Sequence, residues 1–140
     1  MKALLPILAS LAVLTASCGK SKSDDPNPTV YINGSGLPGN WKLVNLQCYC
    51  APAPLPNEQL AITATDFAEY QNGNQILDAT YTIGSTTRCG LPTVVSALDL
   101  VPKATLNMNR NPGYILRGDT LVLDYGSACD APRKTYRRVR

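Results

Sequence analysis

Short runs of Val, Ile, Leu, Thr and Tyr recur from Thr29 to the end of the chain, and Gly, Pro or Asn interrupts them about every 8–12 residues. No stretch of useful length has the apolar spacing of an amphipathic helix, whereas short runs between turn residues are typical of antiparallel strands. The predicted strands are residues 41–50, 60–65, 67–71, 76–83, 94–100, 104–108, 114–116, 120–125 and 135–139. This pattern predicts an all-β domain, a small antiparallel up-and-down barrel of about eight strands, with a β-sandwich as the alternative.

Three segments between the predicted strands have the composition of turns or loops. Asn72-Gly73-Asn74 and Arg117-Gly118-Asp119 each place a glycine among polar residues, which favours a hairpin. Residues 51–56 contain three prolines, and proline cannot donate a hydrogen bond to a sheet. We therefore expect an extended loop after the first strand.

In the first predicted strand, one set of alternate residues is mainly apolar: Lys42, Val44, Leu46 and Cys48. The other set, Leu43, Asn45 and Gln47, is more polar. Because alternate side chains on a strand point to opposite faces, we expect the first set, and the disulfide bonds of its cysteine, to face the interior.

The first 17 residues have the composition of a secretory signal peptide. One lysine precedes an apolar run at residues 3–14, and small residues lead to Cys18. The run is too short to span a bilayer stably. We therefore divide the chain into a signal peptide (1–17), a flexible tether (18–28) rich in Gly, Ser, Lys, Asp and Pro, and the barrel domain (29–140).

Thr15-Ala16-Ser17 before Cys18 resembles the lipobox of bacterial lipoproteins. That resemblance implies that the Cys18 thiol carries a diacylglyceryl group with fatty acids such as palmitate, which would hold the protein on a membrane. The alternative is an ordinary signal peptide with an incidental cysteine. Ser23-Asp24-Asp25 resembles an acidic signal for the outer face of the outer membrane, but the same residues suit a polar linker equally well. The expected location is the outer membrane of the cell envelope, on its periplasmic or its surface-exposed face.

The exported domain contains four further cysteines, Cys48, Cys50, Cys89 and Cys129. We expect it to fold outside the cytoplasm, in an oxidising compartment. An even number in an exported domain predicts two disulfide bonds. Cys48 and Cys50 lie side by side if both belong to a strand and would strain if joined, so we expect each to pair with a distant cysteine, in either of the two possible ways. A four-thiolate metal site or a redox-active pair is the alternative, but the spacing fits neither well.

Charge and composition limit the functions that this chain can have. The net charge is +3, and without Lys2 of the signal peptide 12 basic and 10 acidic residues remain, so nothing predicts nucleic-acid binding. The chain contains no histidine, which is the commonest general base and metal ligand. We therefore expect no catalytic residues, no metal and no cofactor, and a protein that is not an enzyme.

Two short motifs at the ends of the domain suggest a family. Gly39-Asn40-Trp41 resembles the G-x-W motif of lipocalin-like barrels, and Arg137 and Arg138 resemble the arginine that packs across that tryptophan. Residues 118–125, with the terminal Tyr-Arg-Arg, are similar to the last hairpin of small lipocalin-like bacterial lipoproteins. The resemblance covers residues 39–138 and implies a barrel closed by Trp41 and an arginine. The T-D-Y element of larger lipocalins has no clear counterpart here, which argues against a full-sized ligand calyx. Because the predicted strands are short, we expect a mostly filled interior.

The function that these observations favour is binding without catalysis. We expect a membrane-anchored monomer that binds a small apolar ligand or a protein partner through the open end of its barrel. One alternative is a protease-inhibitor-like barrel in which residues 31–38 form the inhibitory arm. The other is a structural envelope lipoprotein that has no ligand.

Three further features suggest weaker hypotheses. The basic residues near the C-terminus, Arg133, Lys134, Arg137, Arg138 and Arg140, could contact anionic headgroups, although a solvated strand face with one arginine on Trp41 is the favoured interpretation. Asp119-Thr120-Leu121 resembles an acceptor for periplasmic O-glycosylation at Thr120. Asp66 with Glu69, or Asp119 with Asp124, could form a carboxylate pair for acid–base chemistry, but no strand pattern brings either pair into a cleft.

Overall fold

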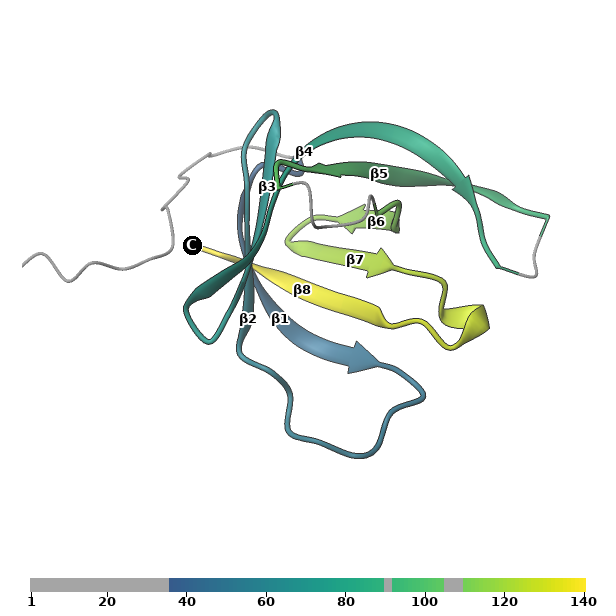
Figure 1. The fold of residues 1–140 in the computed structure, drawn as a ribbon, viewed down its shortest axis with the longest axis horizontal. Coiled ribbons are helices and arrows are strands. Elements are labelled where there is room, and N and C mark those ends of the chain that lie inside the picture. The colour runs from purple at the N-terminus through teal and green to yellow at the C-terminus, as the bar shows by residue number, and fades with distance from the viewer. Residues whose placement is uncertain (1–35, 90–91, 105–109) are drawn as a thin grey trace, which may run out of the picture.

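A computed structural model of the protein describes residues 36–89, 92–104 and 110–140 (Figure 1). The predictions for the signal peptide, for Cys18 and for the tether lie outside these residues, as does most of the proposed inhibitory arm. Within the described residues, no helix is long and apolar enough to cross a bilayer.

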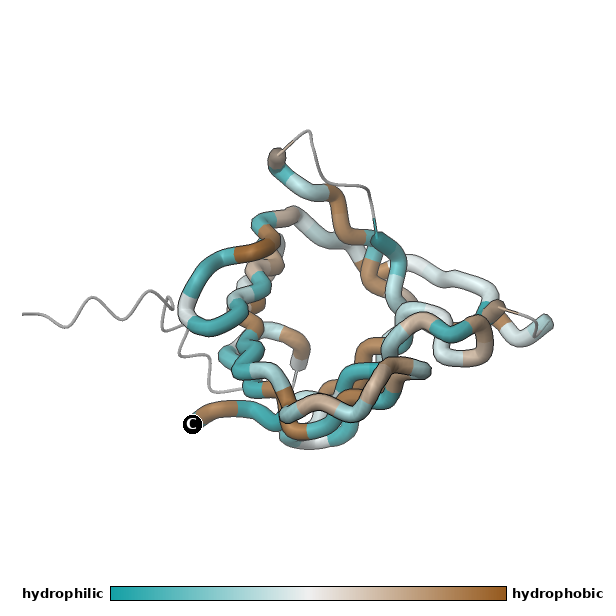
Figure 2. Tube along the Cα trace, turned by 60° about the horizontal axis from the view of Figure 1, so that its bottom comes forward, coloured by the Kyte–Doolittle hydropathy of each residue, from teal (hydrophilic) through white to brown (hydrophobic). Residues whose placement is uncertain are grey.

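Eight antiparallel strands form one closed barrel. They are β1 (Gly39–Gln47), β2 (Glu58–Ile62), β3 (Asp66–Gln71), β4 (Asn74–Thr87), β5 (Val94–Pro102), β6 (Gly113–Arg117), β7 (Thr120–Asp124) and β8 (Arg133–Val139), with a short 3-10 helix, η1 (Ser127–Cys129), between β7 and β8. Each strand pairs with the next one along the chain, and β8 returns to pair with β1, so the backbone forms a ring (Figure 2). The predicted all-β up-and-down barrel is confirmed, and the sandwich alternative is not.

The longest strand, β4, belongs to two pairings in succession. Its first half pairs with β3 as far as Asp66↔Thr80, and its second half pairs with β5 from Ala79↔Pro102 to Thr87↔Val94. The strand curves strongly as it passes from one neighbour to the other (Figure 1). The predicted strand at residues 104–108 is not among the eight strands, because Ala104 lies in a bend and residues 105–109 lie outside the described part of the chain.

Both predicted hairpin turns are present. Asn72 and Gly73 have φ values of 53° and 81°, the left-handed pair that a two-residue hairpin turn favours. Gly118 has a φ of 55° in the turn that follows the pair Arg117↔Thr120. The proline-rich segment after β1 forms the predicted extended loop.

The prediction for the inward face of the first strand was wrong for residues 41–44, whereas beyond them Leu46 and Cys48 are half-buried and Asn45 and Gln47 are exposed, as predicted. Trp41 and Leu43 are buried, whereas Lys42 and Val44 are exposed. The pairing of β1 with β8 shifts register between Leu43 and Asn45, so a bulge interrupts the alternation that the sequence suggested.

The barrel interior around Trp41 is filled by large side chains. The buried cluster takes at least one residue from seven of the eight strands and one from the segment before β1, and partly buried Tyr81, Tyr114, Leu116 and Tyr125 pack against it. Its members are Leu37, Trp41, Leu43, Leu60, Ile62, Phe67, Leu77, Ala79, Leu98, Leu100, Leu121, Leu123 and Tyr136. The predicted filled interior is therefore present at this end of the barrel.

The two disulfide bonds are Cys48–Cys50 and Cys89–Cys129, so the predicted pairing of each C-x-C cysteine with a distant partner was wrong. That prediction placed both residues on a strand, but β1 ends at Gln47 and the chain bends at residues 49–50. The bend brings the two Cα atoms to 5.2 Å, a normal distance for a disulfide.

The two disulfides differ in what they connect. Cys89–Cys129 spans 40 residues and ties the end of the β4–β5 hairpin to η1, which should stabilise the fold by about 4 kcal/mol through loop closure. Cys48–Cys50 closes a loop with a single intervening residue, all within the β1–β2 connection. It joins no two elements of the barrel.

Candidate functional site

One end of the barrel is closed by Trp41 and Arg138, the pair that the G-x-W resemblance implies. The guanidinium of Arg138 lies over the indole, 4.1 Å from the ring centre. The register places them opposite each other, because Trp41 on β1 pairs with Arg138 on β8. Arg137, the other candidate, is exposed on the opposite face of β8 and does not share this position.

The glycine of the motif makes room for that arginine. Gly39 has a φ of 146°, a conformation that side-chain-bearing residues rarely adopt. A methyl group at this position would overlap Nη1 of Arg138. The three residues of the motif therefore have one physical explanation: the glycine leaves space, the tryptophan fills the interior, and the arginine covers the ring.

The segment before β1 is bound to this end of the barrel. Leu37 is buried, and its carbonyl accepts a hydrogen bond of 3.0 Å from Nε1 of Trp41. Arg138 donates to the carbonyl of Pro38 at 2.6 Å and to that of Gly36. Of the proposed inhibitory arm, residues 36–38 thus lie against the barrel, and residues 31–35 lie outside the described part of the chain.

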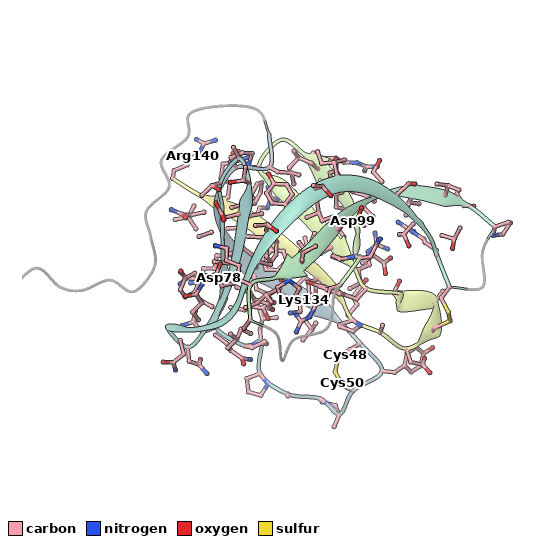
Figure 3. All side chains as sticks on the ribbon, turned by 45° about the horizontal axis from the view of Figure 1, so that its top comes forward. Cys48, Cys50, Asp78, Asp99, Lys134 and Arg140 are labelled. Atoms are coloured by element: carbon pink, nitrogen blue, oxygen red, sulfur yellow. A yellow bond between two sulfur atoms is a disulfide. The ribbon has the colours of Figure 1, made fainter. Side chains whose placement is uncertain are left out.

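Charged side chains occupy the interior farther along the same strands. Glu58 on β2 and Glu69 on β3 are 3% and 1% exposed, and Lys134 on β8, labelled in Figure 3, forms ion pairs with both. The Lys134 amine donates to both oxygens of Glu58, at 2.9 and 2.8 Å, and to Glu69 at 2.8 Å. The hydroxyl of Tyr136 also donates to Glu58. Two carboxylates, one ammonium and one phenol therefore form a connected buried network.

Burial and the neighbouring charged groups shift the pKa values of this network in opposite directions. Burial raises the pKa of Glu58, although the hydrogen bonds from Lys134 and Tyr136 favour its charged form. Burial would lower the pKa of Lys134, but the carboxylates of Glu69 and Glu58 outweigh burial and raise it. The ammonium is therefore the charge that allows both carboxylates to remain in the interior.

Arg110 and Tyr125 extend the network toward solvent. Arg110 is partly exposed and donates to Glu69 at 3.3 Å. The ring of Tyr125 lies 5.7 Å from the amine of Lys134, and burial raises the pKa of its hydroxyl. That hydroxyl is buried, and the neighbouring Arg110 partly offsets the effect of burial on its pKa. The interior at this end is thus filled with polar side chains and is not an apolar calyx.

The sequence pattern did not predict this network, and Lys134 was expected to belong to a basic cluster on the surface. Lys134, Tyr136 and Arg138 alternate along β8 and face inward, whereas Arg137 and Arg140 are exposed. The predicted basic face is therefore divided between the interior and the surface. The period-2 alternation with Tyr136 was the available signal, but only the register of β2 and β3 brings Glu58 and Glu69 to the same place.

The carboxylate pairs that the sequence suggested have separate partners in the structure. Asp66 accepts from Thr63 and Thr65 and pairs with Lys103 at 3.0 Å, while Glu69 belongs to the interior network. Asp119 lies at the Arg138 end of β7 and pairs with Arg140 at 2.6 Å. Thr120 follows it, partly exposed, at the start of β7.

Asp124 is buried at the other end of β7 from Asp119. It accepts hydrogen bonds from the backbone amides of Gly126 and Ser127, at 3.0 and 2.8 Å, and from the Ser127 hydroxyl at 3.0 Å. The guanidinium of Arg88 is 3.9 Å away. Both Asp124 and Arg88 line a hollow of about 320 Å³ beside Cys89. Asp124 therefore fixes the β7–β8 connection and has no second carboxylate among these partners.

An exposed apolar surface lies near the end of β1 and on the loop that joins β1 to β2. Three large side chains are exposed there, Val44 by 45%, Tyr49 by 88% and Leu55 by 47%. A hollow of about 630 Å³ is lined by Val44, by Cys48 and Cys50 and by the proline-rich residues as far as Pro56. A second hollow of about 470 Å³ is lined by Leu46, Cys48, Tyr49, Ser127 and Ala131. We call Val44, Cys48, Tyr49, Cys50 and Leu55 the loop surface; Figure 3 shows its two cysteines on the loop that extends from the barrel.

Among the described residues, no group of three or more Cys, Asp or Glu side chains could hold a metal ion. The eight-stranded antiparallel barrel is consistent with a lipocalin-like fold. Comparison of the sequence with protein-family models and with curated proteins, and of the structure with solved structures, finds no match.

Proposed function

We propose that this chain is a lipid-anchored protein of the bacterial outer membrane, held there through Cys18, and that its barrel binds a protein partner at the loop surface without catalysing a reaction. The observation that carries the proposal is the contrast between the interior and the loop. Apolar side chains and an ion network occupy the interior that the structure describes, while exposed Tyr49 and Leu55 and two hollows lie on the β1–β2 connection, next to exposed Val44 near the end of β1.

The shape and composition of the loop surface favour a protein over a small apolar ligand. Small-ligand sites enclose most of their ligand in a concave cavity, whereas these hollows are open to solvent. An exposed tyrosine beside prolines and leucine is typical of a protein contact, since tyrosine is enriched in the centre of such interfaces. Tyr49, at 88% exposed, has the solvent-exposed ring that a partner would cover.

The position of the loop also suits a tethered protein. The described chain begins at Gly36 beside the Trp41 end, and β1 then runs away from that end for nine residues. Nine residues of strand span about 30 Å, so the loop surface lies about that far from the place where a tether would join. A protein anchored through Cys18 would present this surface away from the membrane.

The first test concerns the anchor. Intact-mass measurement of the protein from its native envelope should give a chain that begins at Cys18 and carries a diacylglyceryl group and an N-acyl chain. Cys18→Ser should retain the signal peptide or release an unlipidated chain from the membrane fraction. An unacylated N-terminus in the native material would contradict the proposed anchor.

The second test concerns the partner. A photo-crosslinking amino acid at Tyr49 or at Leu55 should give one discrete adduct with a protein in the intact envelope. The matched control is Val139, which is 51% exposed on β8 near the opposite end of β1 and should give no such adduct. Adducts of equal yield at all three positions, or none at any, would refute a partner at the loop surface. Native mass spectrometry of the same protein would show a retained small molecule if ligand binding were the function instead.

A further inference from the structure

We propose that Cys48–Cys50 is an exchange-active disulfide that oxidises a dithiol in the partner bound at the loop surface. The inference deepens the proposed function, on which it rests for the identity of the site. It is carried by the position of this disulfide in the fold and by its difference from Cys89–Cys129.

Folding of the barrel contributes little to the stability of the Cys48–Cys50 bond. Both cysteines lie beyond the end of β1 at Gln47, in one loop, with only Tyr49 between them. Opening the bond separates no two strands, because the β1–β2 pairing from Gly39↔Ile62 to Lys42↔Gln59 does not involve these residues. Reduction can therefore proceed in the folded protein.

Thermodynamic linkage predicts that Cys48–Cys50 is reduced more easily than Cys89–Cys129. A disulfide stabilises the fold by the same free energy by which the fold stabilises the disulfide against reduction. Cys89–Cys129 closes a loop of 40 residues and ties β4–β5 to η1, so folding strongly protects it. On loop length alone, the equilibrium for reduction of Cys48–Cys50 should be about 50-fold more favourable.

The surroundings give a partner access to the bond. Cys50 is exposed, and the hollow of about 630 Å³ is lined by both sulfur-bearing residues together with Leu55 and the neighbouring prolines. The second hollow, about 470 Å³, reaches Cys48 from the side of η1. Solvent also reaches Cys89 and Cys129, so accessibility does not distinguish the two disulfides. The apolar loop surface around Cys48–Cys50 does distinguish them, because it can hold a peptide while the exchange occurs.

The exchange transfers two electrons and two protons from the partner to this chain. A thiolate of the partner attacks Sγ of Cys50, the Cys48–Cys50 bond breaks, and Cys48 leaves as a thiolate that takes up a proton. The second thiolate of the partner then attacks the partner's sulfur in the mixed disulfide and displaces Cys50, which is also protonated. The products are a disulfide in the partner and two thiols at Cys48 and Cys50, in a stoichiometric transfer.

The first test compares the two disulfides in one molecule. The full chain is equilibrated in glutathione buffers of graded potential, quenched with acid, alkylated and digested with trypsin. Cys48 and Cys50 then fall in one peptide, and Cys89 and Cys129 fall in two others, so each disulfide is measured separately. We expect Cys48–Cys50 to be reduced at a potential about 50 mV less reducing, which corresponds to the 50-fold difference. Equal midpoints, or earlier reduction of Cys89–Cys129, would overturn the proposal.

The second test measures transfer to a probe, a short unstructured peptide with two reduced cysteines. The oxidised full chain should convert about one equivalent of probe to its disulfide, and the double variant C48S/C50S, which keeps Cys89–Cys129, should convert none. Cys48→Ser should also convert none, because its Cys50 thiol has no disulfide bond for the probe to attack. Probe oxidation that survives in the double variant would overturn the proposal.

The two tests also separate this inference from the function on which it rests. Glutathione equilibration needs no partner and reports the disulfide alone. Crosslinking at Tyr49 and Leu55 reports the partner alone, and Tyr49→Ala should weaken the crosslink at Leu55 without moving the glutathione midpoint by more than about threefold. A labile disulfide with no crosslink would refute the protein partner, and a crosslink with a protected disulfide would refute the exchange.

Discussion

The guanidinium of Arg138 lies 4.1 Å from the centre of the Trp41 ring and also donates hydrogen bonds to the carbonyls of Gly36 and Pro38. One side chain thus joins the last strand of the barrel to the first and to the segment that precedes it. Only arginine has a planar cation that can stack on an aromatic ring and at the same time donate hydrogen bonds in two directions.

We predict that Arg138→Lys lowers the free energy of unfolding by about 1–3 kcal/mol. Lysine keeps the charge but cannot stack on Trp41 and donate to both carbonyls at once. The measurement is urea denaturation followed by the fluorescence of Trp41, the only tryptophan in the chain. The control is Arg137→Lys at the exposed neighbouring position, which should change stability by less than about 0.5 kcal/mol. Equal effects of the two substitutions would contradict a special role for Arg138.

The arrangement around Trp41 could be predicted from the sequence because Gly39 and Trp41 lie on the first strand of the barrel and Arg138 lies on the last. Once β8 pairs with β1 to close a barrel, Trp41 lies opposite Arg138, and Gly39 lies beside the guanidinium. The alternation of β8 distinguishes Arg138 from Arg137. Arg138 is two residues from buried Tyr136 and shares its inward face, whereas Arg137 points outward. Without that alternation, Arg137 and Arg138 are equally good candidates for the position over Trp41.

The disulfide pairing and the ion network could not be predicted in the same way. The bulge after Leu43 and the end of β1 at Gln47 have no residue-type signal, and they decide that Cys48 can reach Cys50. Glu58 and Glu69 are separated from Lys134 by 76 and 65 residues, and only the closed barrel brings them to one point. Their burial depends on long-range register, which local patterns do not contain.

Gly39→Ala is expected to destabilise the barrel through Arg138. The added methyl group would overlap Nη1 of Arg138, and the φ of 146° disfavours any side chain. We expect a cost of about 2–4 kcal/mol, of which backbone strain accounts for about 1–3 kcal/mol. A double-mutant cycle with Arg138→Ala measures the remainder, because removing the arginine relieves the overlap but not the strain. If the stability losses of the two substitutions are strictly additive, Gly39 is not required to make room for Arg138.

Lys134→Met should be far more costly than removal of a surface lysine. It leaves Glu58 and Glu69 buried without the ammonium that contacts both, and we expect a loss of about 3–5 kcal/mol at pH 7. A buried carboxyl without its cation has a raised pKa, and a raised pKa contributes stability at low pH that is lost as the pH rises through it. The difference from wild type should therefore shrink on acidification, as measured by urea denaturation from pH 4 to pH 8.

Lys103→Met provides the matched control for that experiment. Lys103 pairs with Asp66 and Asp78 at 3.0 and 2.8 Å, but all three side chains are largely solvated. Exposed pairs contribute little to stability, so this variant should resemble wild type at neutral pH. A cost for Lys134→Met that stays constant or grows in acid would contradict the proposed role of the ammonium.

Asp124 should account for part of the loss of stability in acid. Burial by itself would raise the pKa of Asp124, but the amides of Ser127 and Gly126, the Ser127 hydroxyl and the charge of Arg88 outweigh burial and lower it. A lowered carboxyl pKa contributes stability above the ordinary Asp value, and this contribution is lost as the pH falls through the lowered value. Asp124→Asn should therefore lower the free energy of unfolding by about 1–3 kcal/mol at pH 7 and by less at pH 3, so that its stability depends less on pH than that of wild type.

The control for this last substitution lies in the same connection between β7 and β8. Asp130 is exposed with a φ of 65°, which asparagine adopts as readily as aspartate, so Asp130→Asn removes the same charge without removing a buried acceptor. Its unfolding curves should follow those of wild type at both pH values. If Asp130→Asn lowers the stability as much as Asp124→Asn does, the effect is one of net charge, and the hydrogen bonds that hold Gly126 and Ser127 do not explain the acid sensitivity of the barrel.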